Sequence, residues 1–241
     1  MKLRLPKIIS HRGAAGHAPE NTLVGIRKAA ELGATWVEFD VKLTSDGIPV
    51  LFHDDTLNRT TDGAGLVAEH TFAELQGLDA GGWYDTKFTG EKIPTLDNAL
   101  ATAAELGLGC NIEVKPSENR EEETATVVAQ KLTDKANTAG PPLLMSSLWR
   151  SVLEILQATL PAIPRGFVVR EIPDDWHSVL DRSDCVSLHA GEWDLSKDKV
   201  AMVHEAGYKL FAFTVNRRRR AEKLFSWEVD GLFSDNPERI G

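Results

Sequence analysis

The sequence predicts a parallel (β/α)8 barrel, the TIM-barrel fold, with a small insertion after the second strand. The chain has 241 residues, close to the usual size of such a barrel and enough for a substantial core. Short apolar runs alternate with longer amphipathic stretches, as strands alternate with helices in α/β proteins. No Gly-x-Gly-x-x-Gly follows the first strand, which weakens the alternative of a doubly wound open sheet. We therefore expect residues 1–241 to form one domain.

Eight short apolar runs are the predicted strands of this barrel. They are Lys7–Ser10, Trp36–Leu43, Gly109–Val114, Leu143–Ser146, Ile163–Val168, Cys185–Leu188, Lys209–Thr214 and Gly231–Phe233. The helices predicted between them are Thr22–Leu32, Leu96–Leu106, Glu121–Ala136, Trp149–Thr159, Asp174–Leu180, Lys197–Ala206 and Arg218–Trp227. Gly33 and Gly107 suit the ends of the first two helices, and Ser196 and Asn216 suit helix N-caps.

One segment, about residues 54–94, interrupts this alternation. It has poor periodicity and many glycines, and a connection of that length in a compact domain is usually functional or a small subdomain. A turn at Ser45–Gly47 precedes it and joins the second strand to an additional extended segment, Ile48–Phe52. Trp83 and Tyr84 within it could form a lid or a wall for a leaving group, or equally the small core of the segment.

The composition is that of an ordinary globular protein with an acidic balance. The net charge is −9, whereas nucleic-acid binding needs a basic face, and the basic run Arg217–Arg220 is expected to be solvated surface. Cys110 and Cys185 lie in apolar segments without metal-ligand spacing, so we expect both to be buried and unpaired. No apolar run is long enough for a membrane span, and no secretory signal is visible. These features predict a cytoplasmic protein, and they leave its oligomeric state undetermined.

Polar side chains that can carry chemistry lie at the ends of the early strands. They are His11 and Arg12 at the first strand, Glu38 and Asp40 in the second, His53 after the extended segment, and Glu113 and Lys115 at the third. Active sites of (β/α)8 barrels form at the carboxyl ends of the strands. We therefore expect these side chains to converge in one cavity.

The three acidic residues Glu38, Asp40 and Glu113 predict a cation site. Converging carboxylates repel one another, so either their pKa values rise or a cation holds them. Hard oxygen ligands without a thiolate favour Mg²⁺ or Ca²⁺ over zinc. The alternative is that these are surface carboxylates paired with nearby lysines, but three acids and two histidines at strand ends argue against it.

The two histidines are the natural acid–base pair, because imidazole titrates near neutral pH. Arg12 can form a two-point contact with a phosphate or carboxylate, and Lys115 adds positive charge beside the metal. Phosphate ester chemistry fits this set. A lyase with a Schiff base on Lys115 is a different class, which the neighbouring Glu113 disfavours because it keeps the lysine charged. A non-catalytic phosphate-binding barrel is the third alternative.

Several motifs, in order, resemble those of the glycerophosphodiester phosphodiesterase family. They are "SHRGAAGHAPENT", "VEFDVKLTSDGIPVLFHDDTLNRTTDG", "IPTLDNAL", "NIEVKP", "FAFTVN" and "VDGLFSDNP", which together run from about Ile9 to Pro237. The resemblance implies a (β/α)8 barrel with an insertion after the second strand. It also implies hydrolysis of glycerophosphodiesters, such as glycerophosphocholine or glycerophosphoethanolamine, to sn-glycerol 3-phosphate and an alcohol. A lysophospholipase D on the same barrel is the alternative.

The resemblance also implies roles for particular residues. His11 and His53 match the family's general acid–base histidines, Arg12 its phosphate-binding arginine and Lys115 its substrate-side lysine. Glu38, Asp40 and Glu113 match its divalent-metal ligands. Attack by a neighbouring glycerol hydroxyl, through a cyclic phosphate, and direct attack by water both remain open. Phe213 stands where the family usually has tryptophan, which keeps apolar contact with substrate but loses the indole donor.

Other polar residues are weaker candidates. His189 could face the site from the sixth strand, or could equally have a polar surface or capping role. Ser146 ends the fourth strand, where it could touch substrate. For Glu20 and Asn21 we favour a structural role in capping the first helix.

Overall fold

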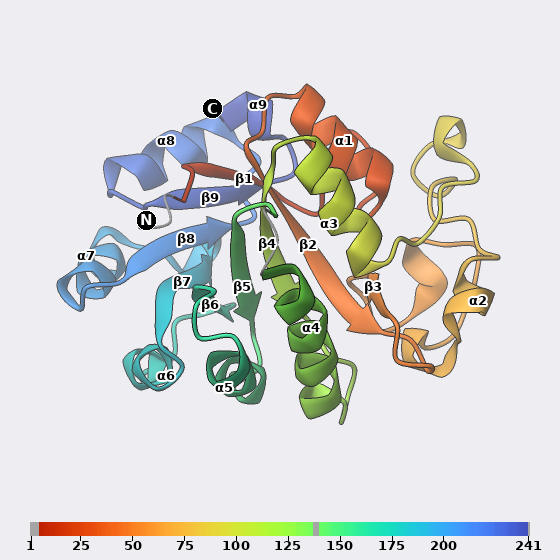
Figure 1. Ribbon diagram of the computed structural model, residues 1–241. Coiled ribbons are helices and arrows are strands. Elements are labelled where there is room, and N and C mark those ends of the chain that lie inside the picture. The colour runs from red at the N-terminus through yellow and green to blue at the C-terminus, as the bar shows by residue number, and fades with distance from the viewer. Residues whose placement is uncertain (1–4, 137–139, 241) are drawn as a thin grey trace.

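Eight parallel strands form a closed barrel in the computed structural model, which describes residues 5–136 and 140–240 (Figure 1). Neighbouring strands follow the order β1, β9, β8, β7, β6, β5, β4 and β2, and a pairing of β1 with β2 closes the ring. Their bounds are β1 Ile8–Ser10, β2 Trp36–Leu43, β4 Gly109–Val114, β5 Leu143–Ser147, β6 Arg165–Val169, β7 Cys185–Gly191, β8 Lys209–Phe213 and β9 Gly231–Ser234. The predicted barrel and all eight of its strands are confirmed.

Helices follow the strands and surround the barrel (Figure 1). Their bounds are α1 Leu23–Glu31, α3 Leu96–Glu105, α4 Glu121–Ala136, α5 Arg150–Thr159, α6 Trp176–Arg182, α7 Lys197–Glu205, α8 Arg218–Ser226 and α9 Pro237–Ile240. Thr22 and Ser196 cap α1 and α7 by accepting a backbone N–H bond at the third helical residue. Gly33 and Gly107 follow α1 and α3 with φ of +83° and +68°, as predicted for residues that end a helix.

Most strand bounds differ from the prediction by one to three residues, and one predicted cap is wrong. The strand expected over Ile163–Val168 begins at Arg165, because the N–H of Ile163 is already bonded within a turn. Asn216 is not the N-cap of α8; Arg217 occupies that position and makes no side-chain cap bond. A polar residue just before a helix is therefore not sufficient evidence for a cap, and Asn216 has a different role, described below.

The two faces of β2 show how the fold separates its core from its site. All eight residues of this strand are buried. Val37 and Phe39 face outward and pack in the core under the helices, whereas Glu38 and Asp40 line the cavity inside the barrel. Below the polar layer, a second cluster fills the barrel interior and contains Ile9, Trp36, Leu144, Phe211 and Phe233. The carboxylates therefore lie next to an apolar cluster in the barrel interior.

The insertion begins with β3 Pro49–Leu51, which runs antiparallel to β2. It continues through η1 Leu57–Arg59, η2 Val67–Glu69, α2 Phe72–Leu75 and η3 Thr86–Phe88, and it projects from one side of the barrel in Figure 1. It has its own hydrophobic cluster, formed by Val50, Phe52, Leu57, Val67, Leu75, Ala80 and Ile93. Trp83 and Tyr84 do not belong to this cluster, so they are not its core.

The remaining predictions concern the two cysteines, the basic run Arg217–Arg220 and the absence of a membrane span. Cys110 and Cys185 are buried and unpaired as predicted, and burial raises the pKa of each thiol to about 12. Arg217, Arg218 and Arg219 are exposed, as expected for solvated charges, whereas Arg220 is half-buried and donates to Glu192. Among residues 5–136 and 140–240, no helix combines the length and the apolar character needed to cross a bilayer.

Candidate active site

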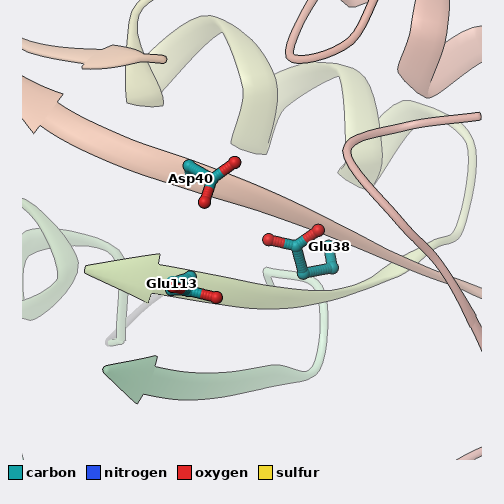
Figure 2. A group of neighbouring side chains, drawn as sticks. All are labelled: Glu38, Asp40 and Glu113. Atoms are coloured by element: carbon teal, nitrogen blue, oxygen red, sulfur yellow. The ribbon is translucent and has the colours of Figure 1, made fainter. Parts of the chain in front are cut away.

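Glu38, Asp40 and Glu113 form one acidic cluster on the adjacent strands β2 and β4 (Figure 2). The strand register pairs Asp40 directly with Glu113, and Glu38 precedes Asp40 by two residues on the same face. One oxygen of each carboxylate lies within 4.8 Å of the others. Glu38 and Asp40 are each 2% exposed, so the cluster is inside the protein rather than on its surface. The alternative of surface carboxylates is therefore wrong.

Burial and neighbouring charges shift the pKa values of all three carboxyl groups. Burial, with the charges of Asp40 and Glu113, holds the pKa of Glu38 well above its usual value. Burial and the charge of Asp40 raise the pKa of Glu113 to about 7. Burial would also raise the pKa of Asp40, but the charges of Arg12 and Lys115 hold that pKa well below its usual range. Asp40 is therefore the carboxyl group that the neighbouring cations stabilise in its charged form, whereas Glu38 and Glu113 bind a proton more readily than usual.

His11 follows β1 and points into the cavity. Its Nδ1 lies 2.7 Å from Asp235 Oδ1, and its Nε2 lies 3.9 Å from Glu38 Oε2. The pKa of Asp235 is lowered: burial opposes the shift, and the bond to His11 and its charge drive it. Because a carboxylate only accepts, Nδ1 donates and Nε2 remains free to exchange a proton. Asn216 holds Asp235 in turn, through a 2.6 Å bond from Nδ2.

Asp235 is a site residue that sequence reasoning missed. It directly follows β9, and the register pairs Ser10 of β1 with Ser234 of β9. His11 and Asp235 therefore leave two neighbouring strands at the same level. The strand-end rule that identified His11 applies equally to Asp235, and the motif "FSDNP" contains it, so the signal was present in the last strand.

His53 follows β3 and has the same kind of partner. Its Nδ1 lies 2.5 Å from Asp54 Oδ1, which leaves Nε2 toward the cavity. The preceding residue is fixed to the barrel, since the Phe52 N–H donates to the Asp40 carbonyl over 3.1 Å. Burial lowers the pKa of His53, and the charges of Arg12 and Lys115 add to that effect against the attraction of Asp40. Its neutral form is therefore favoured.

Arg12 binds the acidic cluster from β1 with both its backbone and its side chain. Its N–H donates to Glu38 Oε2 over 2.8 Å, and its Nε lies 3.3 Å from Asp40 Oδ2 in an ion pair that is not aligned as a hydrogen bond. Its backbone is left-handed, with φ of +50°. At Gly13 the chain turns with φ of +87°, and a Cβ there would lie 2.7 Å from a backbone carbon of Gly25. Close contact with α1, as well as the turn, thus requires glycine.

The helix-capping role expected for Glu20 and Asn21 is wrong, because Thr22 caps α1; the two residues before it instead bond to residues of the site. Asn21 Nδ2 donates to Asp40 Oδ2 over 2.9 Å, and its Oδ1 accepts from the Asp40 N–H over 3.1 Å. Glu20 Oε1 accepts from Arg12 Nη1 over 2.8 Å. Helix-start residue types suit both purposes, so the sequence alone could not separate them.

Lys115 and Lys42 supply positive charge around the carboxylates. Lys115 Nζ lies 3.6 Å from Asp40 Oδ1, as expected of a charged lysine beside the cluster and not of a Schiff-base lysine. Lys42 shares the inward face of β2 and is 1% exposed, and its Nζ donates to Asp55 over 2.6 Å. Sequence reasoning did not identify Lys42, although the alternation that placed Glu38 and Asp40 inward also places it there.

One side of a cavity of about 1200 Å³ is lined by His11, Arg12, Glu38, Asp40, His53, Asp54, Glu113 and Lys115. We call this the charged side: it comes from β1, β2, β4 and the insertion. The opposite side comes from β5 to β8 and the connections that follow them, and we call it the apolar side after its large apolar residues. These include Leu148, Trp149, Val168, Trp193 and Phe213, while Arg150, Arg170 and Glu171 also line this side. Phe213 lies edge-on to Trp193 at 6.2 Å between ring centroids. Leu148 and Trp193 are 40% and 61% exposed, unusual for large apolar side chains.

His189, on β7, lines the cavity, as the expectation that it faces the site requires, whereas Ser146, on β5, is not among the lining residues. His189 is 1% exposed, bonds to Ser187 Oγ over 2.9 Å and packs against Phe211 and Phe233. Burial lowers its pKa to about 3, so it is neutral, and a polar surface role is excluded. Ser146 is buried and accepts a 3.0 Å bond from an asparagine on β4.

This arrangement can bind an anion and exchange protons with it. Two imidazoles present Nε2 toward the cavity, each oriented by a carboxylate on Nδ1, as in acid–base sites generally. Arg12 and Lys115 provide positive charge at the same place. The acidic cluster beneath them has the donor set of a hard-cation site. Together these groups are suited to charge stabilisation and proton transfer at a phosphate ester.

Comparisons with known proteins agree with this geometry. Residues 11–239 match the model of the glycerophosphoryl diester phosphodiesterase family. A glycerophosphodiester phosphodiesterase of Caldanaerobacter subterraneus subsp. tengcongensis is 32% identical, over 97% of this chain and 95% of that protein.

Solved structures share both the fold and the sequence pattern. A phosphodiesterase of Oleispira antarctica, in complex with the product sn-glycerol-3-phosphate, superposes with a TM-score of 0.94 at 43% identity, covering 98% of this chain and 95% of that one. A glycerophosphodiester phosphodiesterase of Agrobacterium tumefaciens gives 0.79 at 26% identity, covering 98% and 99%. With the family model matched over most of its length, the chain is a phosphodiester-hydrolysing enzyme and belongs to the glycerophosphoryl diester phosphodiesterase family.

Proposed function

We propose that this enzyme hydrolyses small glycerophosphodiesters, such as glycerophosphocholine or glycerophosphoethanolamine, to sn-glycerol 3-phosphate and an alcohol, with a divalent metal. One observation carries the proposal: two carboxylate-oriented imidazoles, Arg12 and Lys115 lie around the acidic cluster of Glu38, Asp40 and Glu113 in a single cavity. The Oleispira antarctica structure, whose ligand is the product sn-glycerol-3-phosphate, supports the choice of glycerol.

The acidic cluster fits a hard divalent cation. Within the described part of the chain, the buried Oε1 atom of Glu38 has no hydrogen-bond partner, which is costly unless a cation or water satisfies it. Glu38, Asp40 and Glu113 would hold Mg²⁺ or Ca²⁺ through oxygen atoms only. When bound, the metal supplies Lewis-acid stabilisation of negative charge on a phosphoryl oxygen.

The two histidines divide the proton transfers between them. His53 accepts the proton of the attacking hydroxyl, from glycerol or from water, because burial favours its neutral form. His11 donates a proton to the departing oxygen, and Asp235 on its Nδ1 stabilises the protonated ring. Asp54 fixes the orientation of His53 in the same way.

Arg12 and Lys115 bind the phosphate and balance its charge. Both are partly buried beside Asp40, so they are held in place before substrate arrives. Charge that is oriented in advance in a site with little water stabilises a transition state more than freely moving charge does. Phe213 on the apolar side contacts the carbon atoms of the substrate.

A panel of phosphoesters tests this assignment. Purified protein is given glycerophosphocholine, glycerophosphoethanolamine, a phosphomonoester and a diester without glycerol, and released sn-glycerol 3-phosphate is measured enzymatically. We expect product from the first two substrates only. Turnover of the glycerol-free diester at a comparable rate would overturn the substrate assignment, and release of free phosphate from the monoester would overturn the reaction type.

The apolar side favours a second candidate, a lysophospholipase D-type activity. Exposed Leu148 and Trp193 flank the same cavity and offer an apolar surface to a long leaving group. A series of glycerophosphodiesters with alkyl leaving groups of increasing length separates the two candidates. For the small-substrate enzyme, kcat/KM stays flat with chain length, whereas a steady rise with each added methylene would favour the second candidate.

A further inference from the structure

Arg59, in the insertion, bridges two carboxylates at the edge of the charged side. Its Nε and Nη2 donate to Asp54 Oδ2 and Oδ1 over 2.7 and 2.9 Å. Its Nη1 and Nη2 donate to Glu20 Oε2 and Oε1, each over 2.8 Å. One guanidinium therefore makes two-point contacts with both carboxylates, the geometry that fixes orientation most firmly.

Each of these carboxylates holds a residue of the proposed machinery. Asp54 accepts from Nδ1 of His53 over 2.5 Å, and Glu20 accepts from Nη1 of Arg12 over 2.8 Å. The chain of contacts thus runs from the proton carrier through Asp54, Arg59 and Glu20 to the phosphate clamp. Arg59 itself is not among the residues that line the cavity, so it touches the chemistry only through these partners.

Within residues 5–136 and 140–240, no side chain other than Arg59 holds Glu20 and Asp54, apart from the two residues that they orient. The other hydrogen bond recorded for each side chain is the one to the residue it orients, His53 or Arg12. The side chains of Glu20 and Asp54 are 11% and 26% exposed, so removing Arg59 leaves two partly buried acids free to change rotamer. The bonds from Arg59 also help lower the pKa of both acids and keep them charged acceptors.

The insertion fixes the position of Arg59. Leu57, the first residue of η1, is 1% exposed in the hydrophobic cluster of the insertion, and its N–H donates to the Gly65 carbonyl over 2.9 Å. The burial of Leu57 and this hydrogen bond therefore fix η1 within the insertion. The guanidinium of Arg59 then reaches Asp54, which follows β3, and Glu20, which precedes α1.

We propose that Arg59 is a positioning residue, through which the insertion aligns His53 and Arg12 for the same reaction. The inference rests on the roles given to His53 and Arg12 in the proposed function. It assigns the insertion a part in catalysis: it supplies the residue that locks two separate groups of the charged side into one arrangement.

Arg59→Gln tests this role, with Arg120→Gln as the matched control. Arg120 also makes a two-point contact with one carboxylate, Glu123, over 2.7 and 2.9 Å, but it is not among the residues that line the cavity. We expect kcat for glycerophosphoethanolamine to fall at least about tenfold in Arg59→Gln and less than about twofold in Arg120→Gln. Similar melting temperatures of the two variants would show that the loss is not unfolding.

Two further measurements separate positioning from general destabilisation. Millimolar guanidinium should restore part of the activity of Arg59→Ala, because the ion can occupy the space between the two carboxylates. Glu20→Gln combined with Arg59→Gln should cost little more than Arg59→Gln alone, since both act through one contact chain.

The proposal fails if kcat of Arg59→Gln stays within about twofold of the wild type, if guanidinium restores nothing, or if the two substitutions multiply fully. His53→Gln distinguishes this failure from that of the proposed function. If His53→Gln remains active, the proton-transfer assignment itself is wrong; if it is inactive while Arg59→Gln is unaffected, only the positioning role is wrong.

Discussion

The charged and apolar sides of the cavity are built on different rules. On the charged side, both histidines and Arg12 have a defined partner: His11 bonds to Asp235, His53 to Asp54, and Arg12 to Glu20. On the apolar side, Trp193 is 61% exposed, and among the residues that the structure describes its single ring contact is with Phe213. Hydrogen bonds fix the side chains of the charged side, whereas Trp193 on the apolar side is mostly exposed.

This difference matches the demands of the proposed reaction. Proton transfer and charge stabilisation require groups held within fractions of an ångström, because the orientation of each group is part of the catalysis. A leaving alcohol varies from substrate to substrate and needs only room and apolar contact. We therefore expect substitutions on the charged side to affect rate strongly, and those on the apolar side to affect selectivity weakly.

The largest effect is expected from the histidines of the charged side. His11→Gln and His53→Gln should each lower kcat by about 10²- to 10⁴-fold, because each removes one proton transfer. Initial rates of sn-glycerol 3-phosphate release at saturating substrate would measure the loss. A loss below about tenfold in either variant would mean that its ring is not the proton carrier.

A second effect tests how tightly the charged side is packed behind Arg12. Gly13→Ala should lower the free energy of unfolding by about 2–5 kcal/mol, since it combines a positive φ with a Cβ against the backbone of α1. Gly33→Ala is the matched control: its φ is also positive, at +83°, but nothing lies near its Cβ position. Urea unfolding would measure both, and equal losses would contradict the close-contact explanation.

A third effect concerns the neutral His189 beneath both sides. Its folded pKa of about 3 lies below the usual unfolded value of about 6.5, so between these values the unfolded chain binds more protons. Stability should therefore fall as pH decreases from 6.5 toward 3, by about 2 kcal/mol at pH 5. Urea unfolding at pH 7 and pH 5 would measure it against His189→Gln, which does not titrate. The same pH dependence in both proteins would show that His189 is not responsible.

The smallest effect is expected on the apolar side. Trp193→Ala should change kcat/KM for glycerophosphoethanolamine by less than about threefold, because its mostly exposed ring makes few contacts. The same assay on an alkyl glycerophosphodiester should show the greater loss. A tenfold loss on the small substrate would place Trp193 in the binding of glycerol and remove the distinction between the two sides.

The sequence was sufficient to predict the acidic cluster of the charged side, but not the residues that hold the charged side in place. Strand alternation and the strand-end rule placed Glu38, Asp40 and Glu113 together, because those rules depend only on local pattern and barrel closure. Asp235 follows the same rule, because it directly follows the last strand, β9.

Arg59 could not have been found in this way. Its contacts join residues 39 and 5 positions away through an insertion without regular periodicity, and only the folded path of that segment brings them together. The apolar side was also missed except for Phe213, since Leu148 and Trp193 lie in connections where sequence pattern gives no direction.

Metal dependence is the most direct test of the central claim, that the buried carboxylates and the oriented histidines form one metal-supported hydrolytic site. Release of sn-glycerol 3-phosphate would be measured for the wild type and Glu113→Gln after chelation, then during titration with Mg²⁺ or Ca²⁺. We predict that chelation abolishes wild-type activity, that added metal restores it, and that Glu113→Gln needs a higher metal concentration. Full activity of the chelated wild type would contradict the account.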